Sequence, residues 1–187
     1  MANGRTSGRG EDGRLTLRDH LAIASAPKLA SPIRKGDGRI GPVDVRGAIG
    51  KVWNSPNTAL GLTYGSVGHA VGEVRHAVNP EKYRKPRVVV GDNAVQFRDN
   101  PFGGVSAITI GNTTTYSEPR YYTPVMVQHE KQHTYQGEQL GPFYLASNLA
   151  GGLNALLHGQ DWHGDRNWNE RGPVAHPPRP WAPRKPR

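Results

Sequence analysis

Small and apolar residues recur every three or four positions between Ala48 and Val74, and glycine is prominent among them. This spacing is typical of a close-packed helix or a helical hairpin whose glycine face lies against a neighbouring element. Each interior glycine costs a helix about 1 kcal/mol relative to alanine, so propensity alone argues against the helix. A shorter helical pattern lies in residues 15–29, where Thr16 or Asp19 supplies the N-cap.

Two stretches with a strand pattern follow. Residues 86–98 hold two runs of β-branched and aromatic residues on either side of a Gly-Asp-Asn turn, which predicts a hairpin. Residues 107–116 are rich in isoleucine and threonine and are interrupted near Gly111, so they predict a further strand or a pair of strands.

After residue 122 the period changes to that of a helix. Thr123 followed by Pro124 predicts an N-cap and a first helical residue, and the helix should run over about 123–140 and end at Gly141. A second helix is predicted over about 143–157 from leucines that recur at helical spacing. Together these elements predict an α+β fold with short antiparallel β-elements, two C-terminal helices and coil-rich termini.

Length and composition predict one folded unit. Among 187 residues there are 24 glycines and 16 prolines, so much of the chain must form turns and coil. We predict a flexible basic leader over residues 1–45, a folded domain over 46–170 and a Pro/Arg-rich tail over 171–187. Because cysteine is absent, any metal must be held by His, Asp or Glu.

No apolar run is long enough to predict a transmembrane segment, and the first residues lack the apolar core of a secretory signal peptide. Export would therefore need a specialised secretion system, and the sequence does not specify the localisation. The formal net charge is +9, but residues 51–170 carry ten basic and ten acidic residues, so the excess lies at the two ends. This distribution argues against a specific nucleic-acid-binding domain.

The run His129-Glu-Lys-Gln-His133 is the clearest chemical signal. On a helix the two histidines lie one turn apart on one face, within reach of one ion, and Glu130 lies beside them. Zinc in such a site activates a water molecule, and the adjacent carboxylate serves as general base. The alternative is a pair of structural histidines that are hydrogen-bonded in the interior, with Glu130 solvated.

A third ligand is required, and the longer signature with Gly and His after the second histidine is absent, because those positions are Gln136 and Gln139. The downstream candidates are His158, Asp161, His163, Asp165 and Glu170. We favour Glu170, since residues 167–170 are suited to a short ordered turn after the second helix, and His163 is the runner-up. The alternative for Glu170 is a surface carboxylate that pairs with a neighbouring arginine.

The segment from His129 to Leu145, with its His-Glu-x-x-His-Thr-x-Gln run and Leu-Gly-Pro-x-Tyr-Leu block, resembles the zinc-metallopeptidase domains of bacterial polymorphic toxins, including Rhs-type and type VI secretion-associated effector proteins. The resemblance covers roughly residues 46–182. It implies a zincin-like fold with a gluzincin-like third ligand in a Trp-x-Glu element, here Trp168-Asn169-Glu170. It further implies a peptide or protein substrate, a secretion-system carrier and an immunity protein.

The leading hypothesis is a zinc-dependent metallopeptidase that acts as a secreted bacterial toxin, in which His129, His133 and Glu170 hold Zn2+ and Glu130 is the general base. The edge of strand 107–116 would orient an extended substrate. Candidate oxyanion donors are Tyr135, Tyr144 and His163. The alternatives are a non-catalytic module that binds a partner through its basic, Pro-rich tails, and nucleic-acid binding through the same tails.

Overall fold

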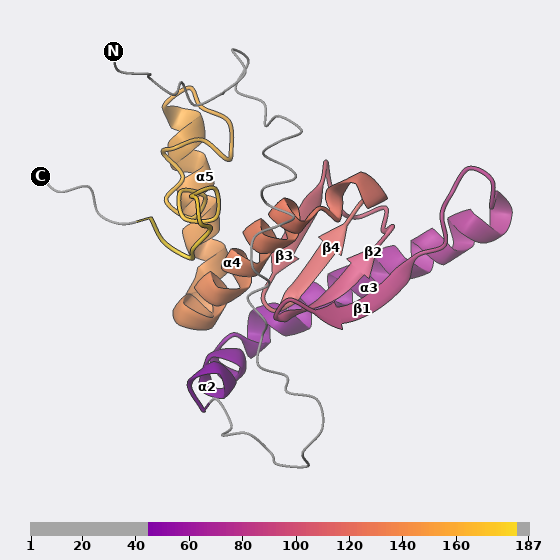
Figure 1. Ribbon diagram of the computed structural model, residues 1–187, viewed down its shortest axis with the longest axis horizontal. Coiled ribbons are helices and arrows are strands. Elements are labelled where there is room, and N and C mark those ends of the chain that lie inside the picture. Colours follow the sequence, from indigo (N-terminus) through magenta and orange to yellow (C-terminus); the bar gives the residue numbers. More distant parts are fainter. Residues whose placement is uncertain (1–44, 183–187) are drawn as a thin grey trace, which may run out of the picture. The chain divides into compact units, whose positions relative to one another are not determined.

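The computed structural model describes residues 45–182, and these form an α+β domain, which confirms the predicted fold class. Figure 1 shows its regular elements. The helices are α2 (Val45–Trp53), α3 (Ser55–Val78), α4 (Pro124–Leu140) and α5 (Tyr144–Leu157), with short 3-10 helices η1 (Pro119–Tyr121) and η2 (Gly141–Phe143). The strands are β1 (Arg87–Gly91), β2 (Ala94–Arg98), β3 (Ala107–Ile110) and β4 (Thr113–Tyr116). The helical pattern at 15–29 lies outside the described residues.

The four strands form one sheet in the order β1-β2-β4-β3. The predicted hairpin over 86–98 is confirmed, because β1 pairs antiparallel with β2. Residues 107–116, predicted as one strand or a pair, form the second hairpin, in which β3 pairs antiparallel with β4. The hairpins join through β2 and β4, which run parallel, so the sheet is mixed and not purely antiparallel as expected. In the first turn Asp92 and Asn93 have φ of 50° and 65°, and in the second Gly111 has φ of 64°. These left-handed turns explain why the strands end where they do.

Helix α3 is the predicted glycine-faced helix, and its glycines lie against the sheet. A Cβ atom at Gly65 would lie 2.3 Å from the Phe97 ring, and one at Gly68 would lie 2.1 Å from Oδ1 of Asn100. Gly61 and Gly72 are buried on the same face. The close approach of the helix backbone to the sheet therefore accounts for residues that helix propensity alone disfavours.

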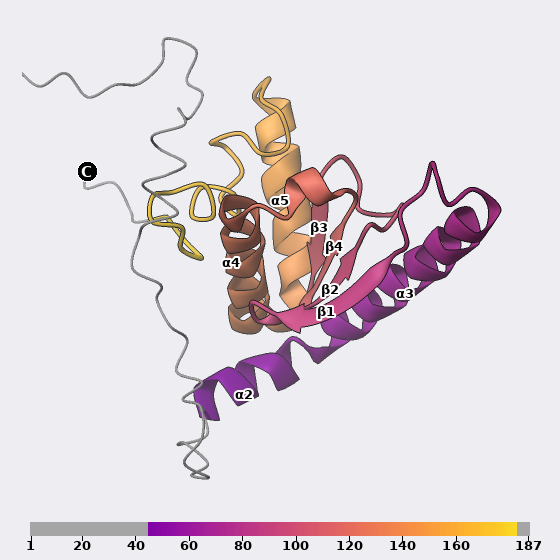
Figure 2. The ribbon, with the colours of Figure 1, turned by 45° about the vertical axis from the view of Figure 1, so that its right-hand side comes forward.

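The two faces of the sheet are covered by different helices. Thr113 lies against Gly61 of α3, whereas the next residue, Thr114, contacts the hydroxyl of Thr109, which in turn donates to Glu130 of α4. Successive strand residues point to opposite faces, so α3 and α4 lie on opposite sides of β4. All four residues of β4 are buried, and Figure 2 shows the sheet between the two helices.

Helix α4 begins and ends where the sequence predicts. The Thr123 hydroxyl accepts a hydrogen bond from the backbone N–H of Met126, and Gly141, with φ of 55°, follows the last residue. Its buried face is mostly polar, and Val125 is 38% exposed. The buried residues are Glu130, Gln132, His133, Thr134, Gln136 and Gly137.

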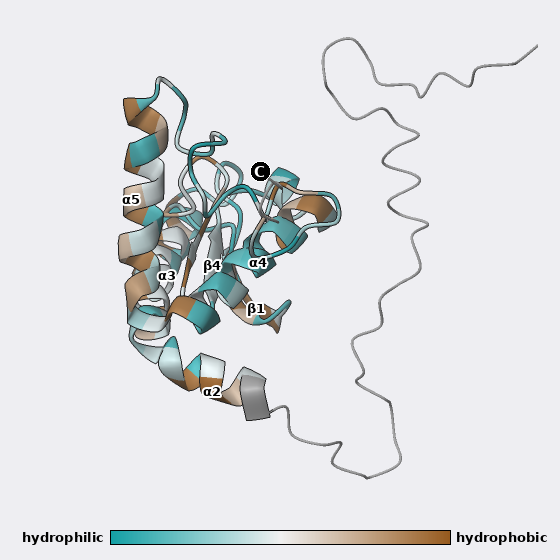
Figure 3. Cartoon of the chain, turned by 90° about the vertical axis from the view of Figure 1, so that its left-hand side faces the viewer, coloured by the Kyte–Doolittle hydropathy of each residue, from teal (hydrophilic) through white to brown (hydrophobic). Residues whose placement is uncertain are grey.

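Helix α5 packs through small residues and not through its leucines. Gly152 lies against the Trp162 ring and Gly151 against Asn167, so the loop after the helix covers this face. Leu153 is 47% and Leu157 85% exposed, and Figure 3 shows hydrophobic residues along the helix. The helix is confirmed, but its leucines are not the buried side. No helix among the described residues is long and apolar enough to cross a membrane.

Candidate metal centre

Three side chains from two distant segments meet at one point. His129 and His133 lie one turn apart on α4, and Glu170 comes from the loop after α5. The Nε2 atoms of His129 and His133 are 3.1 Å apart. Oε2 of Glu170 lies 3.3 Å from Nε2 of His129 and 3.5 Å from Nε2 of His133. The side chains are 17%, 6% and 4% exposed, in that order along the chain.

These spacings fit a metal ion. In a tetrahedral zinc site with bonds of about 2.0–2.1 Å, the ligand atoms lie about 3.3 Å from one another. Oε2 of Glu170 is buried and has no hydrogen-bond partner, although two imidazole nitrogens face it. A buried carboxylate oxygen without a partner is costly, and a cation among the three atoms would satisfy it. Two imidazoles and one carboxylate are also a donor set that zinc prefers.

The amide of Gln136 fixes the ring of His133. Its Nε2 donates to the carbonyl oxygens of Asn169, at 2.7 Å, and Pro180, so its Oε1 is the atom that faces Nδ1 of His133, at 2.9 Å. Because a carbonyl oxygen only accepts, Nδ1 carries the proton in the neutral ring. The lone pair of Nε2 is then directed at the carboxylate and at His129, as a metal ligand requires.

The electrostatics of the cluster favour a positive charge at its centre. Burial lowers the pKa of His133, but the facing Glu170 and the nearby Glu130 outweigh burial and raise this pKa to about 9. Burial raises the pKa of Glu170, but the two facing imidazoles outweigh it and hold this pKa well below its usual range. The carboxylate therefore stays ionised, and a proton or a metal ion balances it.

A hydrogen bond from the sheet holds the side chain of Glu130. Its Oε2 accepts a hydrogen bond from the hydroxyl of Thr109 at 2.7 Å, and that hydroxyl lies 3.0 Å from the hydroxyl of Thr114. Glu130 is buried, and it adjoins His129 in the sequence. Strand β3 therefore fixes the carboxylate that the sequence assigned as the general base.

Glu170 is presented by the ordered turn that the sequence suggested. The N–H of Glu170 donates to the carbonyl of Asn167 at 3.1 Å, and the side chain of Asn169 donates to the carbonyl of Ser147 on α5 at 2.9 Å. The indole of Trp168 also donates to the hydroxyl of Ser147, at 3.0 Å. Glu170 is thus not a surface carboxylate, because its ionic partners are the two histidines.

The other candidate ligands lie elsewhere. Nδ1 of His158 lies 2.7 Å from the carbonyl of Asn154, and the backbone of His163 bonds to Asp161 in an exposed loop. Among the residues that the structure describes, only His129, His133 and Glu170 form a group of metal-ligating type. The structure therefore brings Glu170 to the histidine pair and leaves His163 outside it.

One of the three candidate oxyanion donors, Tyr144, is buried in the domain. Burial together with the charges of Glu130 and Glu170 raises its pKa far above the usual range. Its hydroxyl is therefore neutral and able to donate a hydrogen bond. Tyr135 is half-buried on α4, and His163 belongs to the exposed loop.

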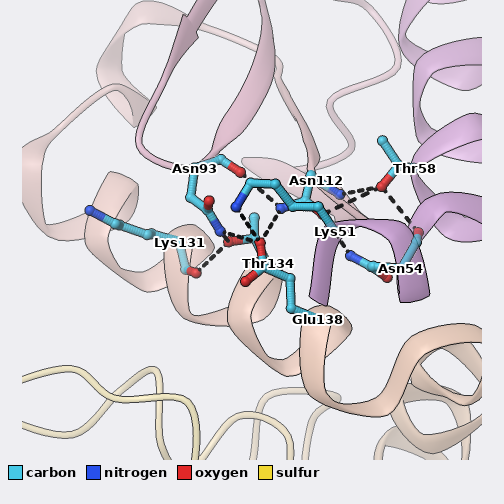
Figure 4. A network of polar contacts seen from close by, with 8 residues as sticks. All are labelled: Lys51, Asn54, Thr58, Asn93, Asn112, Lys131, Thr134 and Glu138. Atoms are coloured by element: carbon cyan, nitrogen blue, oxygen red, sulfur yellow. Dashed lines mark hydrogen bonds and ion pairs between the residues drawn. The ribbon is translucent and has the colours of Figure 1, made fainter. Parts of the chain in front are cut away.

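A polar network anchors the C-terminal half of α4. Oε1 of Glu138 accepts hydrogen bonds from the side chains of Lys51, Asn93 and Asn112, at 2.8–2.9 Å (Figure 4). These donors come from α2 and from the turns of the two hairpins. Since Glu138 lies just over one helical turn after His133, the network ties the ligand-bearing helix to the rest of the domain.

Sequence reasoning missed Thr109 and Gln136. Gln136 lies three residues after His133, on the same helix face, so its position was visible in the sequence. The sequence places Gln136 at the end of the His-Glu-x-x-His-Thr-x-Gln run but assigns it no role, because its partners, Asn169 and Pro180, are more than 30 residues away.

Comparison with protein-family models, curated proteins and solved structures finds no match to this chain.

Proposed function

We propose that this chain is a zinc-dependent hydrolase that cleaves peptide bonds, with His129, His133 and Glu170 as the zinc ligands and Glu130 as the general base. The observation that carries the proposal is the Glu170 contact, because a buried carboxylate oxygen lies 3.3 and 3.5 Å from two imidazole nitrogens and has no hydrogen-bond partner. Three protein ligands are the number typical of catalytic zinc sites, whereas structural sites have four.

Bound zinc would supply a Lewis acid and lower the pKa of its water molecule to about 7. Glu130 would take a proton from that water as its oxygen bonds to the peptide carbonyl carbon, and would pass the proton to the amine nitrogen as the C–N bond breaks. This transfer requires a carboxylate with a fixed orientation. The hydrogen bond from Thr109 provides this orientation and leaves the other carboxylate oxygen for proton transfer. Gln136 holds His133 in the tautomer that presents Nε2 to the metal.

The position of β3 favours a peptide as the substrate. β3 is an edge strand of the sheet and packs beside α4, and its residue Thr109 bonds to Glu130. The free edge of a strand offers backbone N–H and C=O groups to an extended chain. A peptide paired with β3 would therefore lie beside the carboxylate that serves as base.

Metal analysis and one matched pair of variants test the proposal. Purified wild-type protein should bind about one zinc ion per chain, the stoichiometry of a three-ligand site. It should also release fluorescence from a dye-quenched denatured protein. Glu130→Gln should keep the zinc and lose the activity, whereas His133→Ala should lose both. A wild-type chain without zinc, or a Glu130→Gln variant that cleaves as fast as wild type, would refute the proposal.

A further inference from the structure

We infer that Gln136 is a positioning residue of the metal centre: one amide both sets the tautomer of His133 and binds the backbone that presents Glu170. This inference rests on the proposed function. It assigns a role to a residue that neither holds the metal nor contacts the substrate.

The acceptors around Gln136 fix the orientation of its amide. The Nε2 of Gln136 reaches the carbonyl oxygens of Asn169 and Pro180, and both oxygens can only accept. The amide therefore cannot rotate by 180° without placing its own oxygen against two others. Oε1 is held at 2.9 Å from Nδ1 of His133, and the ring must donate its proton there. Gln136 is fully buried, so water does not replace these bonds.

The same amide holds the backbone next to Glu170. Asn169 immediately precedes the third ligand, and its carbonyl accepts from Gln136 while its own side chain accepts from and donates to Ser147 of α5. The backbone next to Glu170 is thus held between α4 and α5. A displacement of Gln136 would move the Glu170 turn and free the His133 ring together.

The chain after Glu170 returns to the same helix. We name residues 171–182 the C-terminal strap. A Cβ atom at Gly172 would lie 2.5 Å from the carbonyl oxygens of Arg179 and Pro180, so the strap folds back on itself, and the indole of Trp181 donates to Oε1 of Gln139 at 2.6 Å. Gln136 and Gln139 therefore anchor the strap on α4, at the two positions where the longer signature would place Gly and His.

The expected size of the effect follows from the bonds that would be lost. Replacement of Gln136 by leucine leaves the Nδ1 proton of His133 and two carbonyl oxygens without their partner in a buried site. Loss of an outer partner of a metal-bound histidine lowers metal affinity by about 10–100-fold. We therefore expect Gln136→Leu to lower the affinity for zinc by about 10–100-fold.

Three variants separate the positioning role from general packing. Gln136→Leu removes both functions of the amide, whereas Gln136→Glu keeps an acceptor for His133 but loses the donor to the carbonyls. Gln139→Leu is the matched control, because it removes an exposed anchor of the strap and leaves His133 alone. Zinc affinity is measured by competition with a chelating dye. Long-range 1H–15N NMR of the zinc-bound protein follows the chemical shift and solvent exchange of the His133 Nδ1–H, which report whether that proton is hydrogen-bonded.

We expect a downfield, slowly exchanging Nδ1–H in wild type and Gln136→Glu, an upfield shift with faster exchange in Gln136→Leu, and an affinity for zinc within threefold of wild type in Gln139→Leu. Unchanged affinity and an unchanged Nδ1–H signal in Gln136→Leu would overturn the inference, as would an equal loss of affinity in Gln139→Leu. If Gln136→Leu does not fold, Gln136→Glu decides, since a fast-exchanging Nδ1–H in that variant overturns the inference and a slowly exchanging one supports it. Absence of zinc from the wild type is a different result, which refutes the proposed function itself.

Discussion

Replacement of Thr109 by valine tests how the sheet positions the proposed base. The change keeps the size and branching of the side chain and removes one hydroxyl. That hydroxyl lies 2.7 Å from Oε2 of Glu130 and 3.0 Å from the hydroxyl of Thr114. The chain offers a matched control in Thr113, a buried threonine of β4 whose hydroxyl has no hydrogen-bond partner. Thr113→Val therefore makes the same chemical change on the opposite face of the sheet.

The two substitutions should have different effects on the rate of cleavage and on stability. A hydrogen bond to a charged group contributes about 1.5–3 kcal/mol, and its loss leaves the buried Glu130 carboxylate without its donor. If the whole of this energy is lost from the stabilisation of the transition state, the rate of cleavage should fall by about 10- to 150-fold. Thr113→Val removes a hydroxyl that is already unsatisfied, so it should leave activity unchanged and leave stability unchanged or slightly higher.

The assay compares the rate of cleavage of a dye-quenched denatured protein at saturating zinc, with zinc content and urea unfolding measured on the same samples. Thr109→Val should retain its zinc and lose rate, since the hydroxyl contacts the base and no ligand. Equal rates in Thr109→Val and Thr113→Val would refute the reasoning. So would a loss of rate that follows a loss of zinc, because the hydroxyl would then act on the metal site and not on Glu130.

Three further outcomes follow from the structure. Removal of residues 171–187 should lower zinc affinity even with Glu170 retained, because the strap that Gln136 and Gln139 bind is lost. Removal of 183–187 should leave the affinity unchanged, and dye competition on both truncations decides. Gly65→Ala should destabilise the domain by about 1–3 kcal/mol, a typical cost of overpacking, because its Cβ would lie 2.3 Å from the Phe97 ring. An unchanged midpoint of urea unfolding would contradict this. The predicted toxin role requires that wild type, but not Glu130→Gln, arrest bacterial growth when made in the cytoplasm or directed to the periplasm; equal growth of both strains in both compartments removes it.

Local signals predicted the elements of this fold well. The Thr123-Pro124 start of α4, the turn at residues 91–93 and the glycine spacing of α3 each reflect a constraint that acts within a few residues. The parallel pairing of β2 with β4 was not predictable in this way. It depends on how two hairpins meet, and no residue pattern within either hairpin records that contact.

The residues of the candidate site show the same difference between short-range and long-range constraints. The spacing of His129 and His133 is a property of one helix, so the sequence was sufficient to place them on one face. The roles of Thr109 and Gln136 depend on contacts across 21 and 33 residues, which the short run containing Gln136 does not specify. The leucines of α5 misled us for a related reason, because helical spacing shows which residues share a face but not whether small residues on another face allow a closer approach.

Because Gly151 contacts Asn167, a substitution on α5 would disturb the candidate metal centre without touching it. Any side chain at Gly151 would place a Cβ atom 2.2 Å from Oδ1 of Asn167, the amide that holds the turn ending in Glu170. A survey of random substitutions would therefore rank this small residue of α5 with the ligands themselves, although it offers no atom to an ion. Attempts to stabilise the protein by replacing helical glycines with alanine should exempt it.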